Sequence, residues 1–315
     1  MTGSVFRTGH SQDYGGAVYL IDLTVSDAVF DGNTAVNKGG AIYISSSAAA
    51  TITNCAFTNN QAVSGSVIYQ LTSLTAVTTI KNATFRLNLG IRVIYSLEGN
   101  LLIATSLFDN NVSVSSPGLY VLLSLLITAN CTEGCFVFAI AGSAFIQGVN
   151  SASGSVAFIQ GSAVTMKSTY FANNAAGYAG TVHTLDQSTV RLAQVTFVHC
   201  VTTLGINSGA SVLHIEQSEL SITGPSKMQD FNNIGIFVSG GSVEIEPVME
   251  GEGALVDGGG LNCVECSSLF IANSAFMRIQ SIFGGCISLD GSLGLDGERR
   301  HNSSGNTTFL EFESE

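Results

Sequence analysis

Residues 38-KGGAIYISSSAAATITNCAFTNN-60 contain, in order, a glycine pair, a short β-branched and aromatic run, a tract of small residues, a second β-branched run and Phe57-Thr-Asn-Asn60. Their apolar residues do not recur at the 3.6-residue spacing of an amphipathic helix. Nor do two alternating runs flank a two-residue turn, as in an isolated hairpin. The order instead predicts several short strands that are separated by Gly and Asn turns.

The same order of residues recurs along the chain. Glycine-led runs of β-branched and aromatic residues begin at Gly15, Gly39, Gly65 and Gly90, at intervals of about 25 residues. A second marker, Phe-x-x-Asn, lies between them. It occurs at Phe30–Asn33, Phe57–Asn60, Phe85–Asn88, Phe108–Asn111 and Phe171–Asn174, with weaker copies that begin at Phe145, Phe197, Phe231 and Phe276.

A repeat of this length predicts one coil of a parallel β-solenoid. A leucine-rich repeat is similarly long but needs a leucine ladder that the chain lacks, and a propeller blade needs about 40 residues. We therefore expect an all-β protein, a single-stranded parallel β-helix (β-solenoid) of about 11 coils. The β-helix should span residues 1–290, with residues 291–315 as a C-terminal polar tail or the start of a further coil.

Stacking of successive coils gives each marker a role. We expect the Phe side chains to stack inside the coil and the Asn side chains to bond to neighbouring turns. Because side chains alternate along a strand, one Tyr per coil should point outward beside inward residues such as Ile42. These tyrosines suit either cross-strand stacking or a surface docking stripe. The stripe would consist of Tyr19, Tyr43, Tyr69, Tyr95 and Tyr120.

At these motifs the chain resembles a known group. Tandem GGA[IVL] and FxxN motifs mark the repeats of the chlamydial polymorphic outer-membrane proteins, and the matches here are Gly15–Val18, Gly39–Ile42 and the five Phe-x-x-Asn markers. The resemblance covers residues 15–120 and 171–185. It implies a right-handed β-helix that is displayed at a surface, commonly as an adhesin.

Composition restricts the partners. The chain has 11 Lys+Arg against 23 Asp+Glu, a net charge of −12, so we expect no nucleic-acid partner. No run of 18 apolar residues occurs, so no transmembrane segment is expected. The first residues lack the apolar stretch of a signal peptide and begin in mid-pattern, which suggests a piece of a longer protein.

The residues of β-helix enzymes are missing from the sequence. A polygalacturonase-like site needs paired aspartates with Gly-His-Gly and Arg-x-Lys elements, and neither element occurs. We therefore predict no enzyme and no catalytic residues. His183, His199 and His214 fall in or near strands of successive coils, but a metal site needs converging imidazoles with a further ligand. We interpret them as outward or partly buried strand histidines and predict no metal site.

The seven cysteines contain three candidate disulfide pairs. Cys131 and Cys135 enclose a predicted turn and could form a local bridge, whereas Cys263 and Cys266 lie about one coil before Cys286, which could bond to either. Cys55 and Cys200 are interpreted as buried apolar residues. An odd count leaves at least one thiol free or paired outside the chain.

Five N-x-S/T sequons add to the case for an extracellular glycoprotein. The glycosylation candidates are Asn82, Asn130, Asn302, Asn306 and Asn111. Asn111 is also the last residue of a Phe-x-x-Asn marker, so its side chain is expected to point inward, where a glycan is sterically difficult.

Two further ligand classes are disfavoured. The acidic segment 244-EIEPVMEGEGALVDGGG-260 carries carboxylates that suit Ca²⁺ but lacks a regular Ca²⁺-binding nonapeptide, so we interpret it as a solvated loop and expect no cofactor. An ice-binding wall needs regular ranks of threonine. Thr51-Ile-Thr53 and Thr78-Thr79 are not expected to keep register across coils.

The sequence therefore favours a non-catalytic structural or adhesive β-helix module that is extracellular or at the cell surface. Its partners would be other extracellular proteins, glycans or further copies of itself, assembled end-to-end or laterally into a filament or surface layer. The alternative is a carbohydrate-binding or carbohydrate-active (lyase- or hydrolase-like) β-helix protein.

Overall fold

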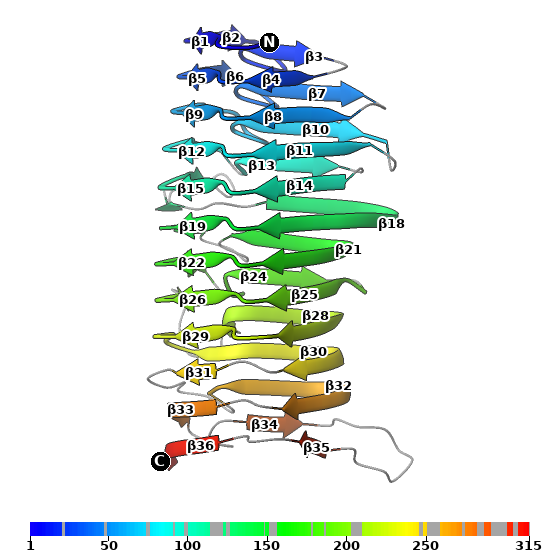
Figure 1. Cartoon of the computed structure of the whole chain (residues 1–315), viewed down its shortest axis with the longest axis vertical. Coiled ribbons are helices and arrows are strands. Elements are labelled where there is room, and N and C mark those ends of the chain that lie inside the picture. Colours follow the sequence, from blue (N-terminus) through cyan, green and yellow to red (C-terminus); the bar gives the residue numbers. More distant parts are fainter. Residues whose placement is uncertain are drawn as a thin grey trace.

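The computed structural model describes the chain except residues 21–22, 47–48, 74–75, 91, 98–99, 114–121, 124–126, 148, 151–155, 178, 186, 203–209, 246–247, 251–258, 273–274, 282–286, 291–300, 305–307 and 315. Every described element is a β-strand, and the strands stack into a rod (Figure 1). Among the described residues, no helix is long and apolar enough to cross a lipid bilayer. The predicted parallel β-helix is confirmed.

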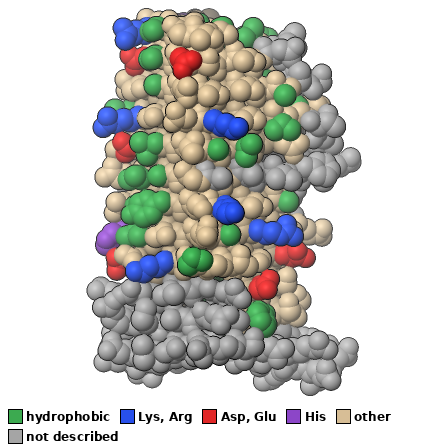
Figure 2. Space-filling model, in the orientation of Figure 1, with side chains coloured by type: hydrophobic (Ala, Val, Ile, Leu, Met, Phe, Trp, Pro, Cys, Tyr) green, Lys and Arg blue, Asp and Glu red, His purple; other side chains and the backbone are tan. Residues whose placement is uncertain are grey.

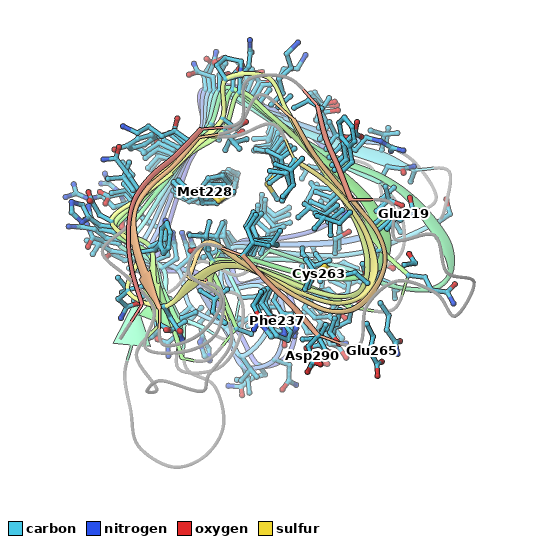
Figure 3. All side chains as sticks on the ribbon, turned by 90° about the horizontal axis from the view of Figure 1, so that it is seen from below. Glu219, Met228, Phe237, Cys263, Glu265 and Asp290 are labelled. Atoms are coloured by element: carbon cyan, nitrogen blue, oxygen red, sulfur yellow. A yellow bond between two sulfur atoms is a disulfide. The ribbon has the colours of Figure 1, made fainter. Side chains whose placement is uncertain are left out.

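One coil consists of three short strands, which the stretch 38–60 shows directly. β7 (Ile42–Ser46) follows the glycine pair, β8 (Ala50–Thr53) follows the small-residue tract, and β9 (Ala56–Thr58) carries the Phe. Each strand pairs in parallel with its counterpart one coil earlier and one coil later. Seen along the long axis, the three strand positions form three walls around a filled interior (Figure 3).

The Phe-bearing strands form one sheet, called here the Phe wall. It consists of β1 (Val5–Arg7), β5 (Val29–Asp31), β9, β12 (Thr84–Arg86), β15 (Leu107–Asp109), β19 (Ala144–Ile146), β22 (Tyr170–Ala172), β26 (Thr196–Val198), β29 (Lys227–Gln229), β31 (Val248–Glu250), β33 (Ala275–Ser281) and β36 (Thr308–Ser314). These are 12 strands, so the count differs from the predicted number of coils. β36 pairs with β33 beyond residue 290.

The other two walls merge into a 17-stranded sheet. Its first column, the Tyr wall, contains β3 (Val18–Leu20), β7, β10 (Ile68–Thr72), β13 (Ile94–Leu97), β24 (Val182–Leu185) and β34 (Ile287–Asp290). Its second column, the Thr wall, contains β4 (Thr24–Ser26), β8, β11 (Val77–Lys81), β14 (Asn100–Ala104), β25 (Thr189–Ala193) and β35 (His301–Ser304). Five long strands belong to both columns: β18 (Ile127–Ala141), β21 (Ala157–Lys167), β28 (Ala210–Thr223), β30 (Ile234–Ile245) and β32 (Leu261–Ala272).

Two small sheets follow the Phe wall along the chain. One joins β17 (Leu122–Leu123), β16 (Val112–Ser113), β20 (Val149–Asn150), β23 (Ala175–Ala176) and β27 (Val201–Thr202), and the other pairs β2 (His10–Ser11) with β6 (Thr34–Ala35). These strands have two residues each, because the chain here is turning from the Phe wall towards the next glycine corner.

Phenylalanine rings stack along the inside of the Phe wall, as predicted. Rings of consecutive coils lie 4.4 to 5.2 Å apart between centroids from Phe6 to Phe197. Met228 takes the next position, opposite Phe197 and inside the walls in Figure 3. The prediction that Phe231 begins a repeat marker was therefore wrong by three residues, because a flexible Met side chain fills the same inward space.

A ladder of buried asparagines lies at the turn after the Phe wall. The side-chain amide of Asn33 donates to Oδ1 of Asn60 at 3.0 Å, and Asn88 donates to Asn111 at 2.8 Å. Each amide also donates to the carbonyl of a Phe one coil earlier, as Asn33 does to Phe6. The ladder thus satisfies turn groups that burial would otherwise leave without water or protein partners.

The glycine pair is required because backbones meet at the corner before the Tyr wall. Gly39 has φ 66°, in the left-handed region that disfavours side chains. A Cβ at Gly40 would collide with the carbonyl oxygens of Gln61 and Ser66 in the next coil. Neither group can rotate away, since both belong to the backbone, so Gly40 cannot be replaced without moving a coil.

Candidate functional site

The predicted tyrosine ladder exists on the outside of the Tyr wall. Tyr19, Tyr43, Tyr69 and Tyr95 are in register on successive strands, and their ring centroids are 5.0, 5.4 and 4.7 Å apart. Tyr14 packs over Tyr43 at 4.8 Å from the segment that precedes the glycine corner. Tyr120 lies outside the described residues.

Two cations cover part of this ladder. The backbone of Lys38 forms isolated parallel β-bridges to Tyr14 in one neighbouring coil and to Ser64 in the other. The Nζ atom of Lys38 lies 4.6 Å from the Tyr69 ring centroid. The Arg92 guanidinium lies 4.7 Å from the ring of Tyr95. Such contacts attract a cation to the electron-rich ring face.

The ladder is therefore not an open docking stripe. Tyr19 is 54% exposed, but Tyr43 and Tyr69 are only 6% and 4% exposed. Burial raises the pKa of Tyr43, although Lys38 opposes the shift. The predicted direction of the side chains was right, but the prediction of an exposed stripe is wrong at Tyr43 and Tyr69, because Tyr14 packs over Tyr43 and Lys38 lies over Tyr69. A buried ring offers no platform for a sugar.

Further along the rod the same column holds two histidines. Its successive members are Tyr95, Thr128, Phe158, His183, His214 and Phe237. His183 on β24 and His214 on β28 are 3% and 5% exposed, and their rings meet edge to face at 4.8 Å. Phe237, which is labelled in Figure 3, covers His214 at 4.7 Å on the other side.

Glu216 brings a carboxylate to both imidazoles. Its Oε1 lies 2.7 Å from Nε2 of His214 and 3.4 Å from Nε2 of His183. Burial lowers the pKa of His183 to about 4, and the neighbouring His214 adds to this shift. Burial also lowers the pKa of His214. Both imidazoles are therefore neutral at neutral pH, despite the nearby carboxylate.

The third histidine of the sequence analysis is elsewhere. His199 lies just after β26 of the Phe wall, with its side chain 60% exposed and its Nε2 3.5 Å from Asp230. Glu216 was not predicted from the sequence, although its two-residue spacing from His214 in His214-Ile-Glu216 indicated that the two side chains lie together. Residues two apart on a strand face the same side, so Glu216 must accompany His214.

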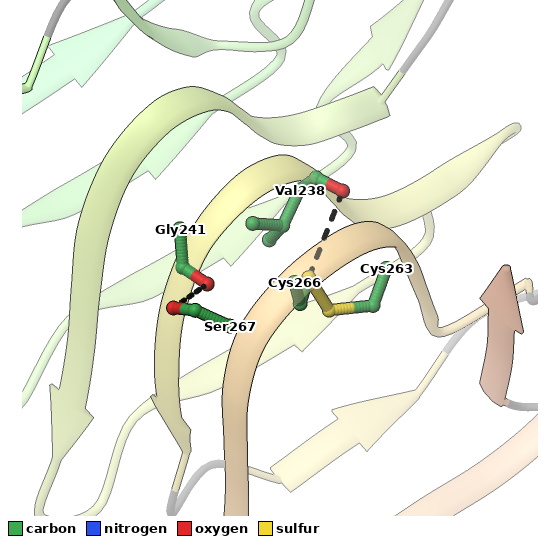
Figure 4. The surroundings of a disulfide bond; sticks show 5 residues. All are labelled: Val238, Gly241, Cys263, Cys266 and Ser267. Carbon is green, nitrogen blue, oxygen red and sulfur yellow. Dashed lines mark hydrogen bonds between the residues drawn. A yellow bond between two sulfur atoms is a disulfide. The ribbon is translucent and has the colours of Figure 1, made fainter. Parts of the chain in front are cut away.

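Among the cysteines whose side chains the structure describes, one disulfide is formed. It joins Cys263 to Cys266 within β32, where Ser267 Oγ donates to the Gly241 carbonyl of the neighbouring coil (Figure 4). Cys131 and Cys135 lie within β18, where the register against β21 shifts on either side of Cys135, so the predicted turn between them is not present. The prediction that Cys286 bonds to Cys263 or Cys266 is wrong, because these two cysteines lie close enough on β32, with Cα atoms 5.8 Å apart, to bond to each other. Cys286 itself lies outside the described residues.

The two remaining cysteines, Cys55 and Cys200, are buried free thiols. Burial raises the pKa of both. Cys200 stands three residues after Phe197, which is the position of the ladder asparagine in other coils.

The sequons differ in access. Asn82 is exposed on the corner between β11 and β12, with φ 50° and its amide donating to Asn54. Asn111 is 1% exposed within the asparagine ladder, so its candidacy for glycosylation is contradicted. Asn130 and Asn302 are located only as backbone in β18 and β35, and Asn306 lies outside the described residues.

The acidic segment is described in part. Glu244 is exposed on β30, within hydrogen-bonding distance of Ser221 Oγ at 3.2 Å, and no side chain from residue 246 to 258 is described. The prediction of a solvated loop is wrong at residues 244–245, which belong to β30, and at Val248–Glu250, which form β31 of the Phe wall; residues 246–247 and 251–258 lie outside the described residues.

Comparison with known proteins identifies the repeat. The family described as Chlamydia polymorphic membrane protein (Chlamydia_PMP) repeat matches residues 27–45, which run from just before β5 into β7. The resemblance inferred from the GGA[IVL] and FxxN motifs is confirmed there. Neither a curated protein nor a solved structure matches the chain.

Proposed function

We propose that the chain is a non-catalytic module displayed at a cell surface, which adheres to other molecules through its Thr wall. The observation that carries this proposal is a column of three threonines in register, Thr24, Thr51 and Thr79, on β4, β8 and β11. Thr24 and Thr51 are exposed and Thr79 is half-buried. The expectation that threonines would not keep register was wrong for these three coils, and the column ends at Leu102.

The Thr wall can contact a partner through uncharged side chains. Threonine presents a hydroxyl and a methyl group on a stiff side chain, so little conformational freedom is lost when a partner binds. Uncharged side chains cover most of the face in Figure 2, and several of its charged side chains lie in neighbouring groups of opposite sign. Contacts made by such a wall depend little on ionic strength, because few charges are there to be screened.

The family match supports the location. The matched residues, 27–45, lie between Thr24 and Thr51 of the threonine column, and proteins with this repeat are surface-exposed outer-membrane proteins. A rigid rod of stacked coils holds such a wall away from the surface to which it is attached.

The test is adhesion of beads coated with the full chain to a cultured epithelial monolayer. We expect binding above that of albumin-coated beads, preserved at high salt, and reduced roughly tenfold when Thr51→Glu and Thr79→Glu are combined. Thr58→Glu, on the Phe wall of the same coil, is the matched control and should bind as the unmodified chain. Binding that is absent, or equal in both variants, would contradict the proposal.

The non-catalytic part has its own test. The chain is incubated with polyuronides and with neutral glycans, and reducing ends and unsaturated products are measured. No product is expected; release of product would favour the carbohydrate-active alternative.

A further inference from the structure

We propose that His183, His214 and Glu216 form a binding site for one divalent transition-metal ion of the Zn²⁺ class. Each side chain offers one ligand atom, a histidine nitrogen or a carboxylate oxygen, and these three atoms all lie within 4.8 Å of one another. The site does not depend on the proposed adhesive function, since it lies on a different wall and in different coils from the threonine column.

The ligand set selects the class of ion. Two imidazole nitrogens with one carboxylate oxygen suit Zn²⁺ and its neighbours in the transition series, whereas Ca²⁺ and Mg²⁺ prefer oxygen ligands alone. A tetrahedral zinc ion with bonds of about 2.0–2.1 Å holds its ligand atoms roughly 3.3 Å apart. The observed separations of 2.7 Å (His214 to Glu216) and 3.4 Å (His183 to Glu216) bracket that value.

The backbone places the ligands without any flexible loop. His183 and His214 are directly paired on adjacent parallel strands, and Glu216 follows His214 by two residues on the same face. Glu216 is itself paired with Ser239 on the next strand, so β30 fixes its backbone on that side. Only side-chain rotations are then needed to close the three atoms around an ion.

The orientation of the two imidazoles suits them as ligands. A metal ion binds the lone pair of a neutral imidazole nitrogen. Nε2 of His214 and Nε2 of His183 both face Oε1 of Glu216, at 2.7 and 3.4 Å. A ring that binds through Nε2 carries its proton on Nδ1, so an Nε2 proton that is donated to Oε1 without an ion has to move when the ion binds.

Glu216 gives the site an opening. Its side chain is 36% exposed, in contrast to the buried histidines. The fourth coordination position can therefore be filled by water or by a group from another molecule, as in zinc sites with three protein ligands. Without an ion, hydrogen bonds from the imidazoles to Oε1 would also bring these three side chains together. The experiment must therefore distinguish a metal site from a hydrogen-bonded cluster.

The test uses the full chain after treatment with a chelator. Co²⁺ is added as a spectroscopic probe and Zn²⁺ by isothermal titration calorimetry. We expect one ion per chain, a visible Co²⁺ absorption of tetrahedral strength, and loss of that absorption when Zn²⁺ is added. Glu216→Gln keeps the shape of the side chain but weakens a ligand, and it should lower the affinity at least about tenfold.

Two controls keep the outcome clear. His199→Ala removes an exposed histidine from the Phe wall and should leave the stoichiometry and affinity unchanged. Circular dichroism shows whether each variant retains the β fold, and His183→Gln provides a second ligand variant if Glu216→Gln is destabilised. No binding at micromolar metal, or binding that Glu216→Gln and His183→Gln leave intact, overturns the site; weakening by His199→Ala alone assigns the metal to the Phe wall and overturns it as well.

Discussion

The side-chain amide of Asn60 donates to Oδ1 of Asn88 at 3.0 Å, although the two residues are 28 positions apart in the chain. The backbone N–H of Asn60 donates to the same oxygen at 2.9 Å, and the second amide hydrogen of Asn60 goes to the Phe30 carbonyl at 2.9 Å. Both side chains are fully buried. One asparagine thus connects the coil before it and the coil after it, and the pattern repeats along the ladder.

Replacing Asn88 by Ala should destabilise the protein strongly. The change leaves two donors of Asn60 and the carbonyl of Phe57 without their partner, and each buried unsatisfied group costs about 1–3 kcal/mol. We expect a loss of at least about 3 kcal/mol in the free energy of unfolding, measured by urea denaturation. Asn82→Ala removes an exposed corner amide and should cost under about 1 kcal/mol. Similar losses in the two variants would show that the buried ladder is not a source of stability.

The phenylalanine stack predicts a cavity effect. Phe85 lies between Phe57 and Phe108, with ring centroids 4.9 and 4.4 Å away, and is 0% exposed. Phe85→Ala should lower the melting temperature and cost about 3–5 kcal/mol, because backbone pairing holds the coils apart and prevents collapse. Phe85→Met should cost clearly less, since Met already fills this position at residue 228. Equal costs for Ala and Met would mean that the wall can close over the gap.

Replacing Gly40 and Gly32 by Ala should distinguish the cost of a steric collision from the cost of backbone strain. Ala at Gly40 would run into two carbonyl oxygens, and we expect a loss above about 2 kcal/mol or failure to fold. Ala at Gly32 meets only Thr8 Cγ2 at 3.7 Å, so it suffers only from its φ of 66°, at roughly 1–2 kcal/mol. Thermal unfolding of both variants measures the difference. If the Gly32 variant were less stable than the Gly40 variant, the close approach of backbones would not lie at Gly40.

The covered tyrosine ladder predicts a delayed ionisation. Because burial raises the pKa of Tyr43, this ring should ionise above the usual value of about 10, in a late component of the absorbance near 295 nm. Tyr43→Phe should remove that component and Tyr19→Phe should retain it. The unfolded chain ionises first, so Tyr43 contributes full stability below about pH 10 and progressively less as the pH rises through its folded value. A titration in which Tyr43→Phe changes nothing would contradict the burial of Tyr43.

Access to the sequons predicts where a glycan is attached. On secretion from eukaryotic cells, folded protein should carry glycan at Asn82 and none at Asn111, because the Asn111 amide is enclosed by Phe85 and Asn88. Mass spectrometry of glycosidase-treated peptides distinguishes the two positions. Glycan on Asn111 in folded protein would be incompatible with the buried ladder.

Most of the fold could be predicted from the sequence, but only part of the candidate site could be. Phe57 and Asn60 could be placed because each coil repeats the same local spacing, which strand stacking converts into a ladder. Met228 could not, since an inward position accepts any apolar side chain of suitable size. The burial of Tyr43 could not be predicted either, because it depends on Tyr14, which packs over the ring from the segment before the preceding glycine corner. Glu216 was accessible to sequence reasoning through its spacing from His214.

The ladders keep their register although the length of chain between their members varies. Asparagine partners are 27, 28 and 23 residues apart, and the paired corner residues Ser106 and Ser143 are 37 apart. Extra residues between two wall strands therefore leave the walls unchanged. Because the coils are spaced about 4.8 Å apart, each insertion lies at a fixed height along the rod. The rod can accordingly serve as a ruler for grafted peptides, with the distance between two grafts chosen by the number of coils between them.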